Sequence, residues 1–248
     1  MEIFSKSNIG TRKENQDRYD SGVIPSLQAA WAVVCDGMGG AKGGSIASSI
    51  AVSYIGEQTA VLIPDLVKMN EKDLSDKLKL IVEEANRKIF DEACRNVNLT
   101  GMGTTCEFIF ISNHHVHVVH VGDSRTYLVK KDEIIQLTED HSVVQEMVKR
   151  KELTQAQAEN HPNKHFITRA LGIRYHVFSD VYKRRLHDDD ILLICTDGLS
   201  NYVTPEEISE VFRQEKGEEA AEALVNRALL AGGSDNITVT IIYSEPVI

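Results

Sequence analysis

The sequence predicts an α+β fold in which two antiparallel sheets stack face to face and helices cover their outer sides. Two observations predict it. Short segments rich in β-formers dominate the middle of the chain, and helix-like segments lie on both sides of them. Each sheet and each helix has an apolar side to cover, and stacked sheets with outer helices cover all of them. The periodicity alone leaves the order of these layers open.

The N-terminal half carries one buried strand and two helices. The apolar run 29–35 ends at Asp36-Gly37, as a buried strand ends at a turn. A glycine-rich loop then leads into residues 45–59, which are small, apolar and compatible with a helix. Residues 73–94 repeat apolar side chains in steps of three and four, which predicts an amphipathic helix.

The centre of the chain predicts strands at 105–112, 115–121, 125–130 and 133–137. Gly122-Asp123 and Lys131-Asp132 lie between them as turn signals, so we expect an antiparallel meander. Strands resume at 177–185 and 190–196, helices follow at 205–212 and 218–231, and a last strand covers 237–243.

The stretch 141–173 is polar and irregular, and it separates two regions of regular strands. Such a segment is better suited to meeting a partner than to filling a core. No Gly/Ser-rich or like-charged linker divides the chain, so we expect one domain over residues 1–248.

The composition excludes several functions. A formal net charge of −10 argues against a nonspecific nucleic-acid or membrane-surface binder. No basic run is longer than the three residues of Lys183-Arg184-Arg185, which also argues against a two-metal nuclease. There is no signal peptide pattern, and we expect no apolar stretch long enough to span a bilayer. The four cysteines show no close pairing, and we expect a cytoplasmic protein.

Four aspartates share one local setting. Asp36 and Asp197 follow apolar strands, Asp235 precedes the last strand, and Asp123 occupies a turn between strands, each with a glycine close by. Carboxylates gathered at one place repel each other unless a cation joins them, and oxygen ligands suit Mg²⁺ or Mn²⁺. Two such ions about 3.5–4 Å apart can activate water and hold a phosphoryl group. Asp-Gly is also a common turn signal, and spacing alone does not bring the four together.

Two other features each have a functional and a structural interpretation. Arg12 offers a guanidinium that can bind phosphate through two hydrogen bonds, although an arginine near a terminus is more often a solvated charge. The run 114–120 contains four histidines, which suggests zinc. In a strand these histidines divide between two faces, so we expect them on an exposed strand face instead.

At these residues the sequence resembles the metal-dependent protein phosphatases (PPM, protein phosphatase type 2C) in their compact bacterial form. The matching segments run nearly from end to end in the family's order. They are Gly10-Thr11-Arg12 to Asn15-Gln16-Asp17, Val34-Cys35-Asp36-Gly37-Met38-Gly39-Gly40, Gly101-Met102-Gly103-Thr104-Thr105, Val121-Gly122-Asp123-Ser124-Arg125, Thr138-Glu139-Asp140-His141-Ser142, Arg169-Ala170-Leu171-Gly172, Thr196-Asp197-Gly198-Leu199 and Gly233-Ser234-Asp235-Asn236-Ile237-Thr238. Each segment is weak alone, but together and in order they are specific.

The resemblance implies a four-layer α/β/β/α sandwich that hydrolyses phosphoserine and phosphothreonine on other proteins. It implies two Mn²⁺ or Mg²⁺ ions, with Asp36 bridging them, the Gly37 carbonyl on one, and Asp197 and Asp235 on the other. Asp123 is similar to a ligand of a third, weaker ion, and Arg12 to the arginine that binds phosphate. The segment at about 142–170 corresponds to a mobile flap. We expect phosphoprotein substrates, a cognate serine/threonine kinase and a monomer.

Two positions depart from the better-known eukaryotic pattern. Gln16 occupies a place where a glutamate often contributes to the metal shell, and we expect Asp17 to act from behind the metal ligands. Met38 occupies the place of a histidine proposed as general acid in some relatives. The alternative to an enzyme is a pseudophosphatase that binds phosphoproteins without cleaving them. Such a protein is expected to have lost a metal aspartate, and this chain retains Asp36, Asp197 and Asp235.

Overall fold

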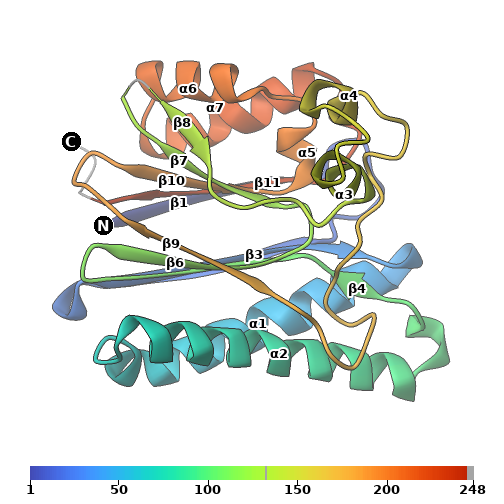
Figure 1. Ribbon diagram of the computed structural model, residues 1–248, viewed down its shortest axis with the longest axis horizontal. Coiled ribbons are helices and arrows are strands. Elements are labelled where there is room, and N and C mark those ends of the chain that lie inside the picture. The colour runs from blue at the N-terminus through green and yellow to red at the C-terminus, as the bar shows by residue number, and fades with distance from the viewer. Residues whose placement is uncertain (132, 245–248) are drawn as a thin grey trace.

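The computed structural model describes residues 1–131 and 133–244, and it has four layers in the order helix, sheet, sheet, helix (Figure 1). Sheet I has the strand order β1 (Glu2–Asn8), β11 (Ile237–Tyr243), β10 (Ile191–Cys195), β7 (Arg125–Val129), β8 (Ile134–Gln136). Sheet II has the order β2 (Asp17–Ile24), β3 (Ala29–Met38), β5 (Cys106–Ser112), β6 (His115–Val121), β9 (Asp180–Arg185), and β4 (Gly103–Thr104) pairs with the end of β3. The predicted sandwich of two antiparallel sheets is confirmed.

Two pairs of helices form the outer layers. Helices α1 (Gly40–Leu66) and α2 (Glu71–Arg95) cover sheet II, and α6 (Pro205–Gln214) and α7 (Gly217–Leu230) cover sheet I (Figure 1). Local residues determine where α6 starts, because Thr204 and Glu207 form a reciprocal capping box and Pro205 occupies the first turn. Short helices α3 (Val143–Lys149), α4 (Gln155–Glu159) and α5 (Asp197–Ser200) lie near one end of the sandwich, and 3-10 turns occur at Pro25–Leu27 and Val97–Leu99.

The strand β3 shows how the layers divide the core. Side chains alternate between the two faces of a strand. Trp31, Val33 and Cys35 therefore pack against α1 and α2, in the core beneath the helices. Ala30, Ala32 and Val34 point the other way, into the core between the sheets. Because both faces are buried, β3 reads as a continuous apolar run up to Asp36.

The expected meander of four consecutive strands is wrong. β5 pairs with β6, and β7 pairs with β8, but β6 lies in sheet II and β7 in sheet I. The turn signal at Gly122-Asp123 therefore marks a crossing between sheets rather than a hairpin, and Asp132 of the second turn signal lies outside the described residues. The crossing places Asp123 at the end of the sandwich, between the layers.

The expectation that no apolar stretch could span a bilayer also needs correction. Gly43–Leu66 in α1 is long and apolar enough by length and composition alone. In the structure, 44% of its most apolar window is buried inside the protein, and α1 packs on β2 and β3. A core helix of this kind meets the same criteria as a membrane span.

Candidate metal centre and phosphate site

A cleft of about 800 Å³ opens where β3 ends and α5 begins. All six residues predicted for the site line it: Arg12, Asp36, Gly37, Asp123, Asp197 and Asp235. They come from both ends of the chain and from both sheets. The fold therefore gathers the aspartates that sequence spacing alone could not bring together.

Asp36 is fixed through its backbone by two threonines. Its N–H donates to Thr105 Oγ1 at 2.9 Å, and its carbonyl oxygen accepts from Thr104 Oγ1 and from the Thr105 N–H, each at 2.8 Å. The carboxylate is thus left to the cleft. At the next position, a Cβ on Gly37 would overlap the carbonyl oxygen of Gly44, so only glycine lets the start of α1 approach β3 this closely.

Asp17 lies directly across from Asp36 in the β2–β3 pairing and is only 3% exposed. Its Oδ2 accepts hydrogen bonds from the hydroxyls of Thr196 at 3.0 Å and Thr238 at 2.7 Å. Its Oδ1 is buried without a hydrogen-bond partner. The two threonines therefore hold one carboxylate oxygen of Asp17 and leave the other oriented for a different partner.

Asp197 is the first residue of α5, and the side chain of Asn201 one turn later donates to its Oδ2 at 3.0 Å. Its Oδ1, like Asp17 Oδ1, is buried without a partner. Buried carboxylate oxygens are normally satisfied. The unsatisfied oxygens of Asp197, which lines the cleft, and of Asp17, which pairs with Asp36, therefore call for a ligand.

Arg12 contacts the last predicted aspartate directly. Its Nη2 donates to Asp235 Oδ2 at 2.7 Å, and its Nε donates to the Ser234 carbonyl oxygen at 3.0 Å. Gly10 makes this approach possible, because its φ of +59° suits glycine and a Cβ there would overlap the Asp235 carbonyl. The expected phosphate-binding arginine therefore contacts an expected metal ligand, and its side chain is 56% exposed.

Asp123 lies in the crossing between β6 and β7 and has the same intermediate exposure as Asp36 and Asp197. It is therefore only partly exposed, although it lies in a turn. Burial, followed by the charge of Asp197, raises the pKa of Asp123 to about 8. The next residue, Ser124, hydrogen-bonds to Thr105, the residue that also fixes Asp36.

The carboxylates raise one another's pKa. Burial raises the pKa of Asp17 to about 7, against the two threonine hydroxyls that lower it. Burial, with the charge of Asp235, raises the pKa of Asp197 to about 6. The pKa of Asp36 lies well above its usual value, because of burial and then the charges of its neighbours, Asp17 first. These carboxylates cannot all be ionised unless positive charge joins them.

This donor set fits hard divalent cations. It offers carboxylate oxygens and the backbone carbonyl next to Asp36, which are the ligands that Mg²⁺ and Mn²⁺ prefer. Within residues 1–131 and 133–244, no three acidic, histidine or cysteine side chains are already drawn into a closed metal site. The aspartates instead surround an open cleft, with unsatisfied oxygens and raised pKa values that bound cations would relieve.

Comparison with known proteins decides the family. The family model described as protein phosphatase 2C matches residues 5–229. The chain belongs to the protein phosphatase 2C family. It is therefore a protein phosphatase, which confirms the predicted family, fold class and enzyme class.

Individual family members agree along nearly the whole chain. The serine/threonine phosphatase stp of Listeria innocua is 36% identical over 85% of this chain and 82% of its own length. The protein phosphatase PhpP of Streptococcus pneumoniae is 33% identical over 98% of this chain and 97% of its own. The catalytic domain of the phosphatase PstP, solved with two manganese ions, superimposes with a TM-score of 0.83 at 31% identity, covering 97% of this chain and 96% of that one.

Within this protein phosphatase 2C fold, Asn236 is a site residue to which the sequence analysis assigned no role, although it lies in the matching segment 233–238. Its Oδ1 accepts from the Gln16 N–H at 2.8 Å, and its Nδ2 donates to the carbonyl oxygens of Ile9 and Glu14 at 3.0 Å. One side chain thus ties the loop that carries Arg12 to the segment that carries Asp235. Its place in that segment, directly after Asp235, was the available signal.

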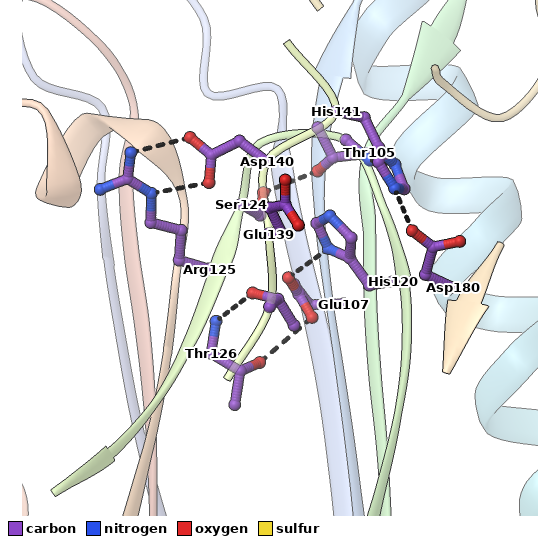
Figure 2. A network of polar contacts seen from close by, with 12 residues as sticks. Thr105, Glu107, His120, Ser124, Arg125, Thr126, Glu139, Asp140, His141 and Asp180 are labelled. Atoms are coloured by element: carbon purple, nitrogen blue, oxygen red, sulfur yellow. Dashed lines mark hydrogen bonds and ion pairs between the residues drawn. The ribbon is translucent and has the colours of Figure 1, made fainter. Parts of the chain in front are cut away.

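The expectation of histidines on an exposed strand face is wrong for His117 and His120, whereas His115 of β6 is half exposed. His117 is 2% exposed and lies 3.1 Å from Ser75 Oγ. His120 is fully buried and pairs with Glu107 at 2.6 Å, between the two sheets (Figure 2). The two buried histidines therefore each have a local partner of their own, and they do not converge on one metal site.

Proposed function

We propose that the chain hydrolyses phosphoserine and phosphothreonine monoesters on proteins, with Asp36, the Gly37 carbonyl, Asp197 and Asp235 holding two divalent cations, Mn²⁺ or Mg²⁺. One observation carries the assignment: the carboxylates converge on one cleft, with raised pKa values and with buried oxygens that lack a partner. When bound, the cations supply Lewis-acid activation of water and positive charge for the phosphoryl oxygens.

Arg12 binds the substrate phosphate in this proposal. Its guanidinium already reaches into the cleft, and its exposed side chain can exchange Asp235 for the oxygens of a phosphate dianion. Two parallel N–H donors match two phosphate oxygens, and they stabilise the negative charge that remains on the equatorial oxygens during transfer. Arg12 therefore orients the phosphorus for in-line attack.

The remaining polar residues hold the ligands in place. Asp17 and Asn201 fix the surroundings of Asp36 and Asp197 from behind. Met38 lines the cleft beside Asp36 and has no proton to give. The proton for the departing serine or threonine oxygen therefore comes from water or from another cleft group. We propose Asp123 as the ligand of a third, weaker cation that assists this departure.

The proposal extends to the organisation and setting of the chain. Residues 1–248 form one catalytic domain, with a flap at about 142–170. The physiological partners are phosphorylated proteins and a cognate serine/threonine kinase, the chain acts as a monomer, and it works in the cytoplasm. His165 and Ile167 of the flap line the cleft, which supports a role for this segment beside the substrate. No observation favours the pseudophosphatase alternative.

The deciding experiment measures phosphate release from phosphothreonine and phosphotyrosine peptides, with Mn²⁺, Mg²⁺ and EDTA compared. We expect cation-dependent release from phosphothreonine, a preference over phosphotyrosine, and no turnover in EDTA. Asp197→Asn should lower turnover by at least about a hundredfold. Asp91→Asn, on the exposed side of α2, is the matched control and should leave turnover unchanged. Full activity in EDTA after dialysis would contradict the cation mechanism.

A further inference from the structure

His141 is a buried histidine at the point where the chain enters the flap. Its side chain is 1% exposed. His141 is not among the described residues that line the cleft. Figure 2 shows it beside Thr105 and above His120, with its ring directed toward Asp180. Its contacts nevertheless lead to the cleft from two directions.

The first direction is the crossing that carries Asp123. The backbone N–H of His141 donates to the Gly122 carbonyl oxygen at 2.7 Å. The Gly122 N–H in turn donates to His141 Nδ1 at 3.1 Å. His141 therefore satisfies both backbone groups of the residue that precedes Asp123. A buried backbone N–H that loses its partner is costly, so this pairing holds the crossing firmly.

The second direction is the base of the flap. The His141 carbonyl oxygen accepts from the Thr168 N–H at 2.7 Å, where the flap returns to the sandwich. Ser142 forms a β-bridge with Ile167, and the Val143 N–H donates to the Phe166 carbonyl oxygen at 2.8 Å. The outgoing and returning legs of the flap are thus joined at His141, and the returning leg carries Ile167 into the cleft.

The hydrogen bonds assign the tautomer of His141. Because an amide N–H can only donate, Nδ1 accepts from Gly122 and the ring proton lies on Nε2. Nε2 then donates to Asp180 Oδ2 at 3.0 Å. Arg169 Nη1 lies 3.1 Å from Nε2, but because both atoms carry protons it donates to Asp180 Oδ1 at 3.2 Å instead. Burial, followed by the nearby His120, lowers the pKa of His141 to about 4, so the ring stays neutral and its Nδ1 lone pair remains available to Gly122.

A rigid polar base supports the ring. The His141 and His120 rings lie 4.4 Å apart between centroids, with their planes tilted by 46°. His120 is in turn bound to Glu107, which also accepts from Thr126 Oγ1 at 3.1 Å (Figure 2). Since this base is fully buried between the sheets, the His141 ring cannot shift inward.

We propose that His141 is a positioning residue that sets the Asp123 crossing and the base of the flap in one fixed relation. Asp123 and the cleft-facing part of the flap then take their places together, and neither can move without disturbing the other. The catalytic side of this inference rests on the proposed role of Asp123, whereas its structural side rests on the contacts alone.

Two conservative variants separate the two ring nitrogens. In His141→Asn the amide oxygen reproduces the Nδ1 acceptor for Gly122 but does not reach Asp180. In His141→Gln the amide nitrogen can reach Asp180 but leaves Gly122 without an acceptor. His141→Ala removes both. His117→Asn is the matched control, because it removes an equally buried histidine of β6 whose partner, Ser75, lies on α2 away from the cleft.

The first readout is amide hydrogen exchange in the metal-free protein, over 121–124 and over the flap. His141→Ala should exchange about tenfold faster in both segments. His141→Asn should restore protection at 121–124, and His141→Gln should not. The second readout is phosphothreonine peptide turnover against Mn²⁺ concentration. His141→Ala and His141→Gln should need about tenfold more Mn²⁺ for half-maximal turnover, and His141→Asn much less. His117→Asn should change neither readout.

The outcomes divide cleanly. Wild-type exchange at 121–124 in His141→Gln, or identical behaviour of the Asn and Gln variants, would overturn the proposal. If His141→Ala does not fold, the Asn and Gln pair still decides. Two other results would contradict the proposed function rather than the positioning role. The wild type would release no phosphate, or Asp123→Asn would leave the Mn²⁺ dependence of turnover unchanged. The exchange data would then still confirm or overturn the positioning role.

Discussion

Burying a carboxylate is unfavourable unless each oxygen has a partner, and the cleft shows how single residues meet that requirement. The threonine hydroxyls at 196 and 238 bind one oxygen of Asp17, and the other oxygen has none. Asn201 does the same for Asp197. In both aspartates, hydrogen bonds from the protein fix Oδ2. This also fixes the direction of Oδ1, which has no protein partner of its own.

The guanidinium of Arg12 should determine how tightly the substrate phosphate binds. Arg12→Ala should raise the KM for a phosphothreonine peptide about tenfold to a hundredfold, because a charge-assisted pair contributes roughly 1.5–3 kcal/mol. Arg12→Lys should recover only part of the loss, since a point charge lacks the two-pronged geometry. Steady-state kinetics at saturating Mn²⁺ check both variants.

The cation affinity separates this role from a structural one. Because Arg12 pairs with Asp235, removing it should leave Mn²⁺ binding by calorimetry unchanged or slightly tighter. Lys6→Ala, on a surface ion pair with Glu222, is the matched control and should keep a wild-type KM. Unchanged peptide kinetics in Arg12→Ala would falsify the phosphate assignment.

Local sequence patterns predicted which helices and strands form, but not which strands pair with each other. The helices at 73–94 and 205–212 and the strand at 237–243 are confirmed, because periodicity and capping residues are local signals. The partner of a strand is not local, so a turn signal at Gly122-Asp123 predicted a hairpin where the chain changes sheets. β1 and β2 were missed because their side chains are mostly half-exposed and their apolar pattern is weak.

The same distinction applies to the site. Asp36 and Asp197 stand out because each ends a buried strand, and the family motifs supply Arg12, Gly37, Asp123 and Asp235. The contact between Arg12 and Asp235 joins residues from opposite ends of the chain, and no local pattern contains it. Asn236 was overlooked for the same reason, since its three hydrogen bonds reach a loop near the N-terminus.

The flap should determine which phosphoproteins the enzyme prefers. Replacing residues 142–170 by the corresponding segment of another family member should change the preference among phosphoprotein substrates. It should change hydrolysis of a small aryl phosphate much less, because only His165 and Ile167 of this segment are among the described residues that line the cleft. The ratio of kcat/KM values for the two substrate types is the measurement.

The graft must keep the residues that join the two ends of the flap to each other and to His141. Ser142, Ile167 and Thr168 should be kept, since they form the contacts with each other and with His141. A graft with its base intact that loses both activities equally would show that the segment belongs to the chemistry or to the fold. A graft of the loop between α3 and α4 alone, at 150–154, is the milder control.

For the whole molecule, the acidic cleft links stability to pH. Asp17, Asp197 and Asp123 have pKa values raised to about 7, 6 and 8, so the metal-free folded state binds more protons than the unfolded state across this range. The contribution of each is complete below the unfolded pKa and is lost as pH rises through the folded one. In EDTA, the Tm should therefore fall between about pH 6 and pH 8, by roughly 4 °C or more.

Bound cations replace those protons, so saturating Mn²⁺ should flatten the decline and stabilise the protein more at high pH than at low pH. Thermal unfolding at several pH values, with EDTA and with Mn²⁺, measures this. Asp76→Asn, an exposed carboxylate on α2, should keep the wild-type slope. Parallel curves with and without Mn²⁺ would show that the cation does not bind at the titrating aspartates.

The pairing of β1 with β11 has a consequence for synthesis. β1 lies at the edge of sheet I and pairs only with β11, Glu2 against Tyr243, so it has no partner in that sheet until β11 has been translated (Figure 1). Until then Asp17 lacks Thr238 and Arg12 lacks Asp235. We expect a nascent chain to have no working cleft at any intermediate length. Activity should appear in a single step once β11 has been translated, because the pairing of β1 with β11 brings the two parts of the cleft together.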